Sequence, residues 1–269
     1  MGLFSKKKRT GDGRSNQINK LIDERKNLLF FNKNFFVREA YKTLRTNVMF
    51  SLTGETDCKI LVVSSSLQSE GKSTSSVNLA ISYAEADKRV LLIDCDMRKP
   101  KLARLMAMSN TVGLSNVLID PSLLGDALMK SRLEKLDVLL AGDIPPNPSE
   151  LLSSTRMQRL LETMKKKYDY IILDTPPVNL VTDAVVLAPH TDGVLMVVRA
   201  GRTERGSLIN AVSQLEYAHA KVLGFILNGV GMESTNYRYS KYRYSSYRRY
   251  GYYNYSSRSH PTGRPSEEA

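Results

Sequence analysis

The chain has 269 residues, of which 42% are hydrophobic and 25% are charged, and its formal net charge is +12. This composition is typical of one soluble globular domain with a large buried core. Its longest apolar runs, such as residues 194–198, are about five residues long, whereas a membrane-spanning helix needs roughly 20, and the N-terminus has no apolar stretch that suits a secretory signal.

The positive charge is concentrated at the two ends of the chain. Residues 1–45 carry 12 Lys/Arg and 4 Asp/Glu, and residues 237–269 carry 7 and 2, so the segment between them has a net charge of −1. Basic ends of this kind contact anionic membranes, nucleic acids or acidic partners, or are merely solvated. The charge alone leaves these alternatives open.

The elements alternate regularly along the chain. A helix is predicted near 39–52 because Ala40, Leu44 and Val48 recur at helical spacing. Aliphatic strands are then predicted at 59–64, 90–94, 136–140, 170–174, 193–198 and 222–227. Amphipathic helices are predicted between them, near 72–87, 149–167, 183–189 and 204–219, the second of them introduced by an N-cap signal at Asn147 and Pro148. This order predicts an α/β fold with a mainly parallel sheet flanked by helices.

Composition divides the chain into three parts. Residues 1–34 are expected to be a basic flexible segment, 35–232 the folded domain, and 233–269 a flexible tail, since the periodicity stops after Gly231 and a Tyr/Ser/Arg sequence begins.

A phosphate-binding loop follows the first strand. Residues 66–74 read Ser-Leu-Gln-Ser-Glu-Gly-Lys-Ser-Thr, which is a Walker A sequence with Ser66 in place of the first glycine. A loop that turns into a helix directs several backbone N–H groups at a phosphate. Gly71 allows close backbone approach, Lys72 reaches the β- and γ-phosphates, and the Ser73 hydroxyl binds Mg²⁺.

Three aspartates support the same site. Asp94 and Asp96 follow the second strand, and Asp174 ends a later one. Ligands of parallel α/β sheets bind at the carboxyl ends of strands, and Mg²⁺ prefers oxygen ligands. Any one of these aspartates could instead cap a helix, but together with the loop they predict a shared metal and nucleotide site.

These residues carry a resemblance. Over about residues 35–255 the chain resembles the bacterial tyrosine kinase family that regulates capsule and exopolysaccharide synthesis, with Asp94-Cys-Asp96-Met-Arg98 as its Walker A′ motif and Asp174-Thr-Pro-Pro as its Walker B motif. The resemblance implies a P-loop NTPase fold of the deviant Walker A branch, ATP and Mg²⁺ as cofactors, and ATP-dependent autophosphorylation. It assigns catalysis to Lys72, Asp94, Asp96 and Asp174, metal binding to Ser73, Asp94 and Asp174, and ATP binding to Ser69, Glu70, Gly71, Lys72, Ser73, Thr74 and Asn228.

Nine of the 14 tyrosines lie in the C-terminal tail: Tyr237, Tyr239, Tyr242, Tyr244, Tyr247, Tyr250, Tyr252, Tyr253 and Tyr255. Their spacing suits neither a helix face nor a strand. Aromatic residues mixed with arginines can bind single-stranded nucleic acid. Beside a nucleotide site, and given the family resemblance, the alternative is favoured that these hydroxyls are the autophosphorylation sites, and nucleic acid is not expected as a partner.

Glu39, Lys42 and Arg45 resemble the family's oligomerisation motif, E-x-x-R-x-x-R, with Lys42 in place of the first arginine. The alternative is an ordinary exposed intrahelical pair. The resemblance implies a ring-shaped homo-oligomer that phosphorylates its tails in trans. It also implies a separate transmembrane activator of the polysaccharide chain-length regulator type, which recruits a cytoplasmic protein to the inner face of the plasma membrane, where the basic N-terminus could contact anionic lipids.

Two rivals remain from the sequence. The first is a partition or division-site ATPase, which could bind DNA with its basic ends, although those proteins carry a lysine where this chain has Leu67. The second is a catalytically weak nucleotide-dependent scaffold, which only an assay would separate from a kinase.

Overall fold

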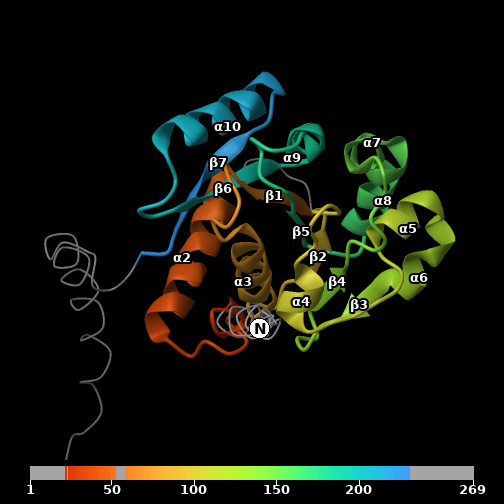
Figure 1. The fold of residues 1–269 in the computed structure, drawn as a ribbon. Coiled ribbons are helices and arrows are strands. Elements are labelled where there is room, and N and C mark those ends of the chain that lie inside the picture. The colour runs from red at the N-terminus through yellow and green to blue at the C-terminus, as the bar shows by residue number, and fades with distance from the viewer. Residues whose placement is uncertain (1–21, 23, 53–57, 231–269) are drawn as a thin grey trace, which may run out of the picture. The chain divides into compact units, whose positions relative to one another are not determined.

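A seven-stranded sheet forms the centre of the fold in the computed structural model (Figure 1), which describes Ile22 and residues 24–52 and 58–230. Its strand order is β3-β4-β2-β5-β1-β6-β7, and every pair is parallel except β3 with β4. The strands are β1 (Lys59–Ser65), β2 (Val90–Asp94), β3 (Leu128–Lys130), β4 (Leu136–Leu139), β5 (Tyr170–Asp174), β6 (Gly193–Arg199) and β7 (Val222–Asn228). The predicted α/β fold with a mainly parallel sheet is confirmed.

Helices cover both faces of this sheet. They are α2 (Phe35–Ser51), α3 (Lys72–Ala84), α4 (Leu102–Met106), α5 (Leu114–Ile119), α6 (Leu124–Ala127), α7 (Pro148–Ser153), α8 (Thr155–Lys165), α9 (Asp183–Leu187) and α10 (Arg205–Tyr217), with 3-10 turns η1 (Pro121–Leu123) and η2 (Ala188–His190). In Figure 1, α2 lies beside α3, and α10 lies against β7. The predicted helix at 149–167 is two helices, because Ser154 is extended and its hydroxyl caps α8.

Successive residues of the central strands point to opposite faces. In β1, Ile60 and Val62 pack in the cluster that α5, α8, α9 and α10 cover, whereas Leu61 and Val63 pack in the cluster that α2, α3 and α4 cover. All four side chains are fully buried. Burial on both faces explains why these strands are continuous runs of Ile, Leu and Val.

The N-cap signal at residue 147 is correct in position and wrong in chemistry. Asn147 precedes α7 and Pro148 is its first residue, as predicted, but the Asn147 side chain makes no hydrogen bond to a backbone N–H of the helix. Its amide donates to the Glu150 carboxylate instead.

The packed region begins before residue 35, where the sequence placed the start of the folded domain. Leu28 and Leu29 are buried in the cluster beneath α2 and α3. The buried Asn78 side chain of α3 holds this segment: its Oδ1 accepts the Leu29 N–H at 2.8 Å and its Nδ2 donates to the Asn27 carbonyl at 3.0 Å. The expectation of one flexible segment through residue 34 is therefore wrong for residues 27–29.

The first of two compact units in the chain ends at Asn228. The predicted tail and its tyrosines, and residues 1–21, lie outside the residues that the structure describes. Within the described ranges, no helix has the length and apolarity that crossing a bilayer requires.

We predict that Asn78→Ala lowers the free energy of unfolding by about 2–4 kcal/mol, because the buried Leu29 N–H and Asn27 carbonyl each lose this partner. Chemical denaturation measures the change. Glu162→Ala, at an exposed position on α8, serves as the control and should stay within about 0.5 kcal/mol of the parent. An equally small loss for Asn78→Ala would mean that residues 27–29 are not held by this amide.

Candidate active site

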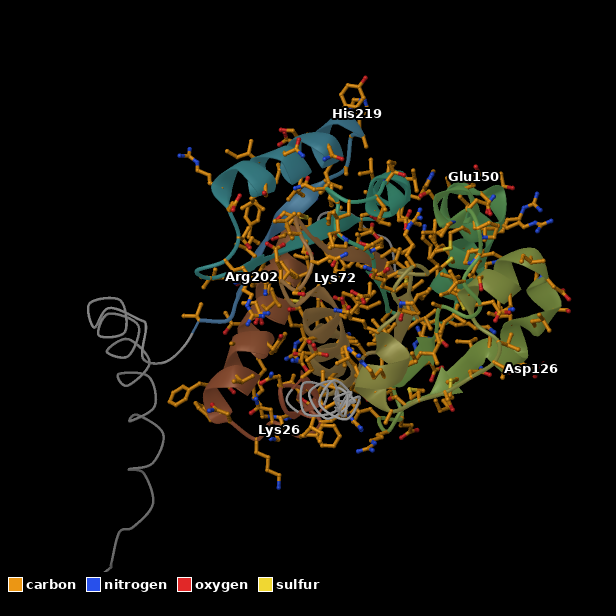
Figure 2. The ribbon with its side chains drawn as sticks, in the orientation of Figure 1. Lys26, Lys72, Asp126, Glu150, Arg202 and His219 are labelled. Carbon is orange, nitrogen blue, oxygen red and sulfur yellow. The ribbon has the colours of Figure 1, made fainter. Side chains whose placement is uncertain are left out.

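Three adjacent strands bring the predicted site residues together. The loop at residues 66–71 follows β1, Asp94 ends β2 and Asp174 ends β5, with Asp94 and Asp174 opposite each other in the strand register. Because β2, β5 and β1 are neighbours and parallel, their carboxyl ends meet at one edge of the sheet. Figure 2 shows Lys72 near the centre of the ribbon, while Asp126, Glu150 and His219 lie at its periphery.

Among the residues that the structure describes, Lys72 is the one buried cation at the carboxyl ends of these strands. Its Nζ lies 2.8 Å from Asp96 Oδ2, 4.0 Å from Asp174 Oδ2 and 3.4 Å from the Ser73 hydroxyl. The side chain is only 9% exposed. Asp96 and Asp174 therefore orient the Lys72 side chain.

Asp94 is occupied by backbone contacts. Its Oδ2 accepts the N–H groups of Lys101 and Leu102, at 3.1 and 3.0 Å, and its Oδ1 accepts the Asp96 N–H at 3.2 Å. Asp96 in turn accepts the Lys99 N–H at 3.0 Å. In this structure Asp94 fixes the loop that presents Asp96 and leads into α4.

The cluster of Lys72 with Asp94, Asp96 and Asp174 has fewer positive than negative groups. Burial raises the pKa of Asp94 to about 7, and the Asp174 charge adds to the rise. Burial also raises the pKa of Asp174, against the opposing effect of Lys72. Desolvation lowers the pKa of Lys72, but Asp174 and Asp96 outweigh it and leave that pKa raised. Three buried carboxylates around one ammonium favour a bound proton or a further cation.

One atom of the cluster is suited to such a cation. The Oδ2 of Asp174 is buried without a hydrogen-bond partner among the described residues, while its Oδ1 accepts the Ser76 hydroxyl at 3.0 Å. Among the described residues, no group of three or more His, Cys, Asp and Glu side chains could hold a metal ion by itself. This arrangement fits Mg²⁺, which commonly takes one or two protein ligands and completes its shell with phosphate and water.

The loop backbone requires glycine at residue 71. Gly71 has φ +101°, and a Cβ there would lie 1.9 Å from Asn228 Nδ2. That amide donates to the Glu70 carbonyl at 2.9 Å, so the end of β7 touches the phosphate loop. Asn228, which was expected to bind ATP, lies against the phosphate loop.

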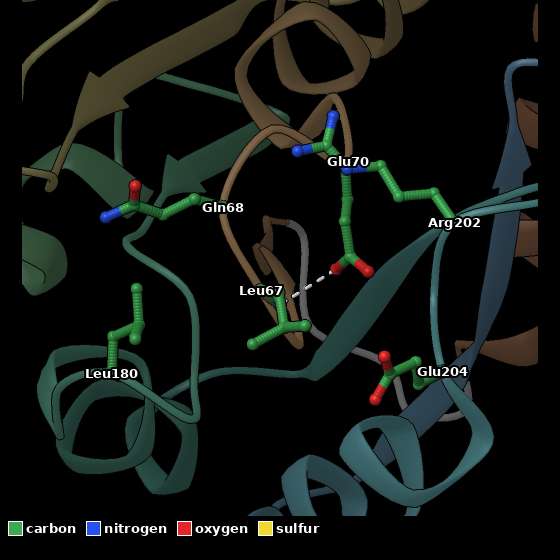
Figure 3. Close-up of a pocket in the computed structure, with 6 residues that line it drawn as sticks. All are labelled: Leu67, Gln68, Glu70, Leu180, Arg202 and Glu204. Carbon is green, nitrogen blue, oxygen red and sulfur yellow. Dashed lines mark hydrogen bonds between the residues drawn. The ribbon is translucent and has the colours of Figure 1, made fainter.

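Glu70 holds the loop from within. It is 1% exposed, and its carboxylate accepts the Ser66 hydroxyl at 3.0 Å. It also accepts the Leu67 N–H at 2.9 Å (Figure 3). Thr203, between β6 and α10, also donates to it. The serine that replaces the first glycine of the motif thus has a structural role as a donor to Glu70.

The other two loop residues differ in setting. Ser69 has φ +66°, and its carbonyl accepts Arg199 Nη1 at 3.3 Å. Thr74 is half-buried on the first turn of α3. Sequence reasoning missed Arg199 and Thr203, because about 130 residues separate them from the loop.

Two adjoining clefts open beside the loop. The first, which we call the Lys72 cleft, has a volume of about 350 Å³ and is lined by Lys72, Asp96, the basic residues 98, 99 and 101, and an apolar wall that includes Pro177 and Leu180. The second, the adjoining recess of about 500 Å³, is lined by Leu67, Gln68, Glu70, Leu180, Arg202 and Glu204 (Figure 3).

A buried aspartate behind the Lys72 cleft was also missed. Asp183, at the start of α9, pairs with Arg98 at 3.2 Å and accepts the Ser149 hydroxyl of α7. This contact joins the Walker A′ loop to two helices of the opposite layer. Arg98 within the motif was the only signal for it in the sequence.

The predicted oligomer residues differ in their surroundings. Lys42 pairs with Glu39 at 2.7 Å on an exposed part of α2. Arg45 instead donates to the Ser82 carbonyl of α3 and lies 3.4 Å from the Ser82 hydroxyl. Arg45 therefore has an intramolecular partner that the sequence did not predict.

We predict that Asp174→Asn makes the nucleotide- and metal-free protein more stable at pH 7, by about 1–3 kcal/mol, because it removes one of three crowded carboxylates. Since the folded-state pKa of Asp94 is about 7 and its ordinary value is 3.8, wild-type stability should fall as pH rises from about 4 to 7. The variant should show a smaller fall in chemical denaturation with EDTA.

The exposed Asp126 supplies the control, as Asp126→Asn should leave this pH dependence unchanged. If Asp174→Asn proves less stable than wild type at every pH, the carboxylates do not repel one another as described.

Comparison with known proteins agrees with this geometry. A family model described as an AAA domain matches residues 58–223. The tyrosine-protein kinase YwqD of Bacillus subtilis is 42% identical over 71% of this chain and 80% of its own length. The kinase domain of the Escherichia coli tyrosine kinase ETK aligns with a TM-score of 0.70 at 36% identity, over 74% of this chain and 78% of that domain. The septum site-determining protein MinD of Pyrococcus horikoshii, complexed with Mg-ADP, has a TM-score of 0.54 at 22% identity, over 63% of this chain and 70% of that one, which shows a shared fold alone. The identity to YwqD over most of both chains, together with the likeness to the ETK kinase domain, shows that this chain belongs to the bacterial tyrosine kinase family.

Proposed function

We propose that this protein transfers the γ-phosphoryl group of ATP to tyrosine hydroxyls, including those of its own C-terminal cluster. The observation that carries the proposal is the position of Lys72, whose Nζ lies between Asp96 and Asp174 at the inner end of a cleft beside the phosphate loop. Phosphoryl transfer is catalysed mainly by positioning and charge stabilisation, which this arrangement supplies.

The nucleotide would lie on the loop formed by residues 69–74, with Asn228 at its edge. Lys72 would stabilise the charge of the transferred phosphoryl group. Mg²⁺, held by Ser73 and Asp174, would neutralise phosphate charge and orient the reacting oxygens. The unpartnered Asp174 Oδ2 supports this metal position.

Asp96 is the best-placed candidate to accept the proton of the acceptor tyrosine, because it lines the Lys72 cleft and is nearly buried. Asp94 was expected to bind metal and assist catalysis as well. Its backbone contacts favour a positioning role, in which it fixes Asp96, although a carboxylate with three N–H contacts retains acceptor capacity for a metal.

The acceptors would be the nine tail tyrosines from Tyr237 to Tyr255, which lie beyond the described residues. We retain residues 35–232 as the kinase domain, preceded by an N-terminal segment of which residues 27–29 pack against it, and 233–269 as the tail. Residues 237–269, which contain the nine tyrosines, have a net charge of +5, and full modification would add roughly −13 to −18 charges to them and could separate neighbouring subunits.

Family membership supports the remaining parts of the proposal. These are assembly into a ring, transfer in trans, regulation of capsule or exopolysaccharide synthesis and export, and recruitment to the inner face of the plasma membrane by a separate transmembrane activator. A partition-type ATPase is the second candidate. Its support is the fold shared with MinD, and its weakness is Leu67, which stands in the position of the lysine those ATPases carry.

We predict that Lys72→Met lowers the rate of tyrosine phosphorylation by about 10²–10³-fold, because the developing phosphoryl charge loses its buried cation. The phosphatase-treated protein is incubated with Mg-ATP, with and without the cytoplasmic segment of the activator, and phosphotyrosines are mapped by mass spectrometry. Lys88→Met, at an exposed position before β2, is the matched control and should retain activity.

The Lys72→Met chain also tests transfer between subunits. Mixed with an active chain that lacks the tail, it should acquire phosphotyrosine on its own tail. An unmodified tail in this mixture would rule out transfer in trans. Tight, ATP-dependent DNA binding in a mobility-shift assay would favour the partition ATPase.

We predict that Glu39→Ala and Lys42→Ala reduce oligomer size in light scattering while changing the free energy of unfolding by less than about 0.5 kcal/mol, because their mutual pair is exposed. Arg45→Ala should instead cost about 1–2 kcal/mol of stability, since the Ser82 carbonyl loses a charged donor. Oligomers of unchanged size in Glu39→Ala would contradict the role of this helix in assembly.

A further inference from the structure

The side chains that line the Lys72 cleft include four cations and one carboxylate, Asp96. Two of its cations have carboxylate partners, since Lys72 binds Asp96 and Arg98 binds Asp183. The other two are Lys99 and Lys101, which we call the lysine pair. Among the described residues, no carboxylate lies within ion-pair distance of either ammonium group, and both side chains line the cleft.

The backbone N–H groups of the lysine pair have a structural role of their own. The Lys99 N–H binds Asp96 and the Lys101 N–H binds Asp94, so the main chain at these residues positions the aspartates. Their side chains are not needed for that contact. The two ammonium groups are therefore available to an anion that enters the cleft.

The wall facing these cations is apolar. It consists of Pro176, Pro177, Leu180 and Val181, in the segment after β5. Proline and aliphatic surfaces can pack against an aromatic ring, while cations bind anionic groups beside it. The cleft thus combines a surface for a tyrosine ring with a site for negative charge next to that tyrosine.

The excess of cations over carboxylates is found in the lining of the Lys72 cleft and not in the adjoining recess. The adjoining recess is lined by one cation, Arg202, and two carboxylates, Glu70 and Glu204 (Figure 3). That recess offers no net attraction to an anion. A charge preference of the acceptor site would therefore come from the lysine pair.

We propose that the lysine pair is an anion subsite that selects acceptor tyrosines with a phosphotyrosine or an acidic residue close by in the sequence. This inference rests on the proposed kinase function and names its substrate class. Residues 237–269 of the unmodified tail carry 7 Lys/Arg against 2 Asp/Glu and are a poor ligand for such a subsite. Each phosphotyrosine adds about −1.5 to −2 charge, so the first modification makes the neighbouring tyrosines better acceptors.

Binding of two peptides to the full chain tests the proposal. Both have the sequence of residues 237–244, carry a fluorescent label, and differ only in a phosphate on the tyrosine at position 242. With phosphatase-treated protein and Mg-ADP, fluorescence anisotropy should show that wild type binds the phosphorylated peptide about tenfold more tightly. In the double variant Lys99→Gln/Lys101→Gln this ratio should fall to about two or less.

A charge-matched control separates the subsite from general attraction. Lys88→Gln/Lys166→Gln also removes two exposed lysines, but these precede β2 and β5 and lie toward the amino ends of the strands, opposite the carboxyl ends where the cleft is. It should keep the wild-type ratio. The lysine-pair variant should also retain its affinity for Mg-ADP, measured by calorimetry.

Three results would overturn the proposal: equal ratios in wild type and the lysine-pair variant, an equal loss in the control variant, or a lost Mg-ADP affinity that assigns the lysines to the nucleotide. Failure of the proposed kinase function is seen separately. In that case wild type would form no phosphotyrosine on its tail by mass spectrometry, whatever the ratio of peptide affinities.

Discussion

The structure of the site depends on one buried ammonium group among three buried carboxylates. With all four groups ionised, Lys72, Asp94, Asp96 and Asp174 carry a net charge of −2 in a place that water hardly reaches. Such a cluster is costly to a fold unless protons or a cation complete it. This unfavourable cluster lies at the carboxyl ends of strands that are buried on both faces of the sheet. Stability and function therefore make opposite demands on the same carboxylates.

Contacts outside the Walker A motif also determine the position of Lys72. Lys72 is the first residue of α3. Farther along this helix, Asn78 binds Asn27 and Leu29, and Ser82 accepts a hydrogen bond from Arg45 of α2. The helix that presents Lys72 is therefore held by the same α2 that carries Glu39 and Lys42. Subunit contacts on the exposed part of α2 would act on a helix that touches α3 directly, which gives assembly a physical connection to the active site.

Features with a strong period or a local motif could be predicted from the sequence. The central strands were found because their aliphatic runs are buried on both faces, and the phosphate loop because Gly71, Lys72 and Ser73 are adjacent. Short elements such as α4, α6 and β3, of five, four and three residues, lack the length in which a period appears. Contacts across the fold, such as Asp183 with Arg98 or Thr203 with Glu70, leave no trace in spacing. Arg45 was assigned to an interface for the same reason, because its partner Ser82 is 37 residues away.

The departures of this chain from the usual motif are explained by contacts within one subunit. Ser66 donates to Glu70, Thr203 and the Leu67 N–H bind the same carboxylate, and Asn228 closes the loop from β7. Residue 67 is a leucine that lines a recess. Leucine has no charge to offer a phosphate group, so the loop is held in its shape by these contacts within one subunit.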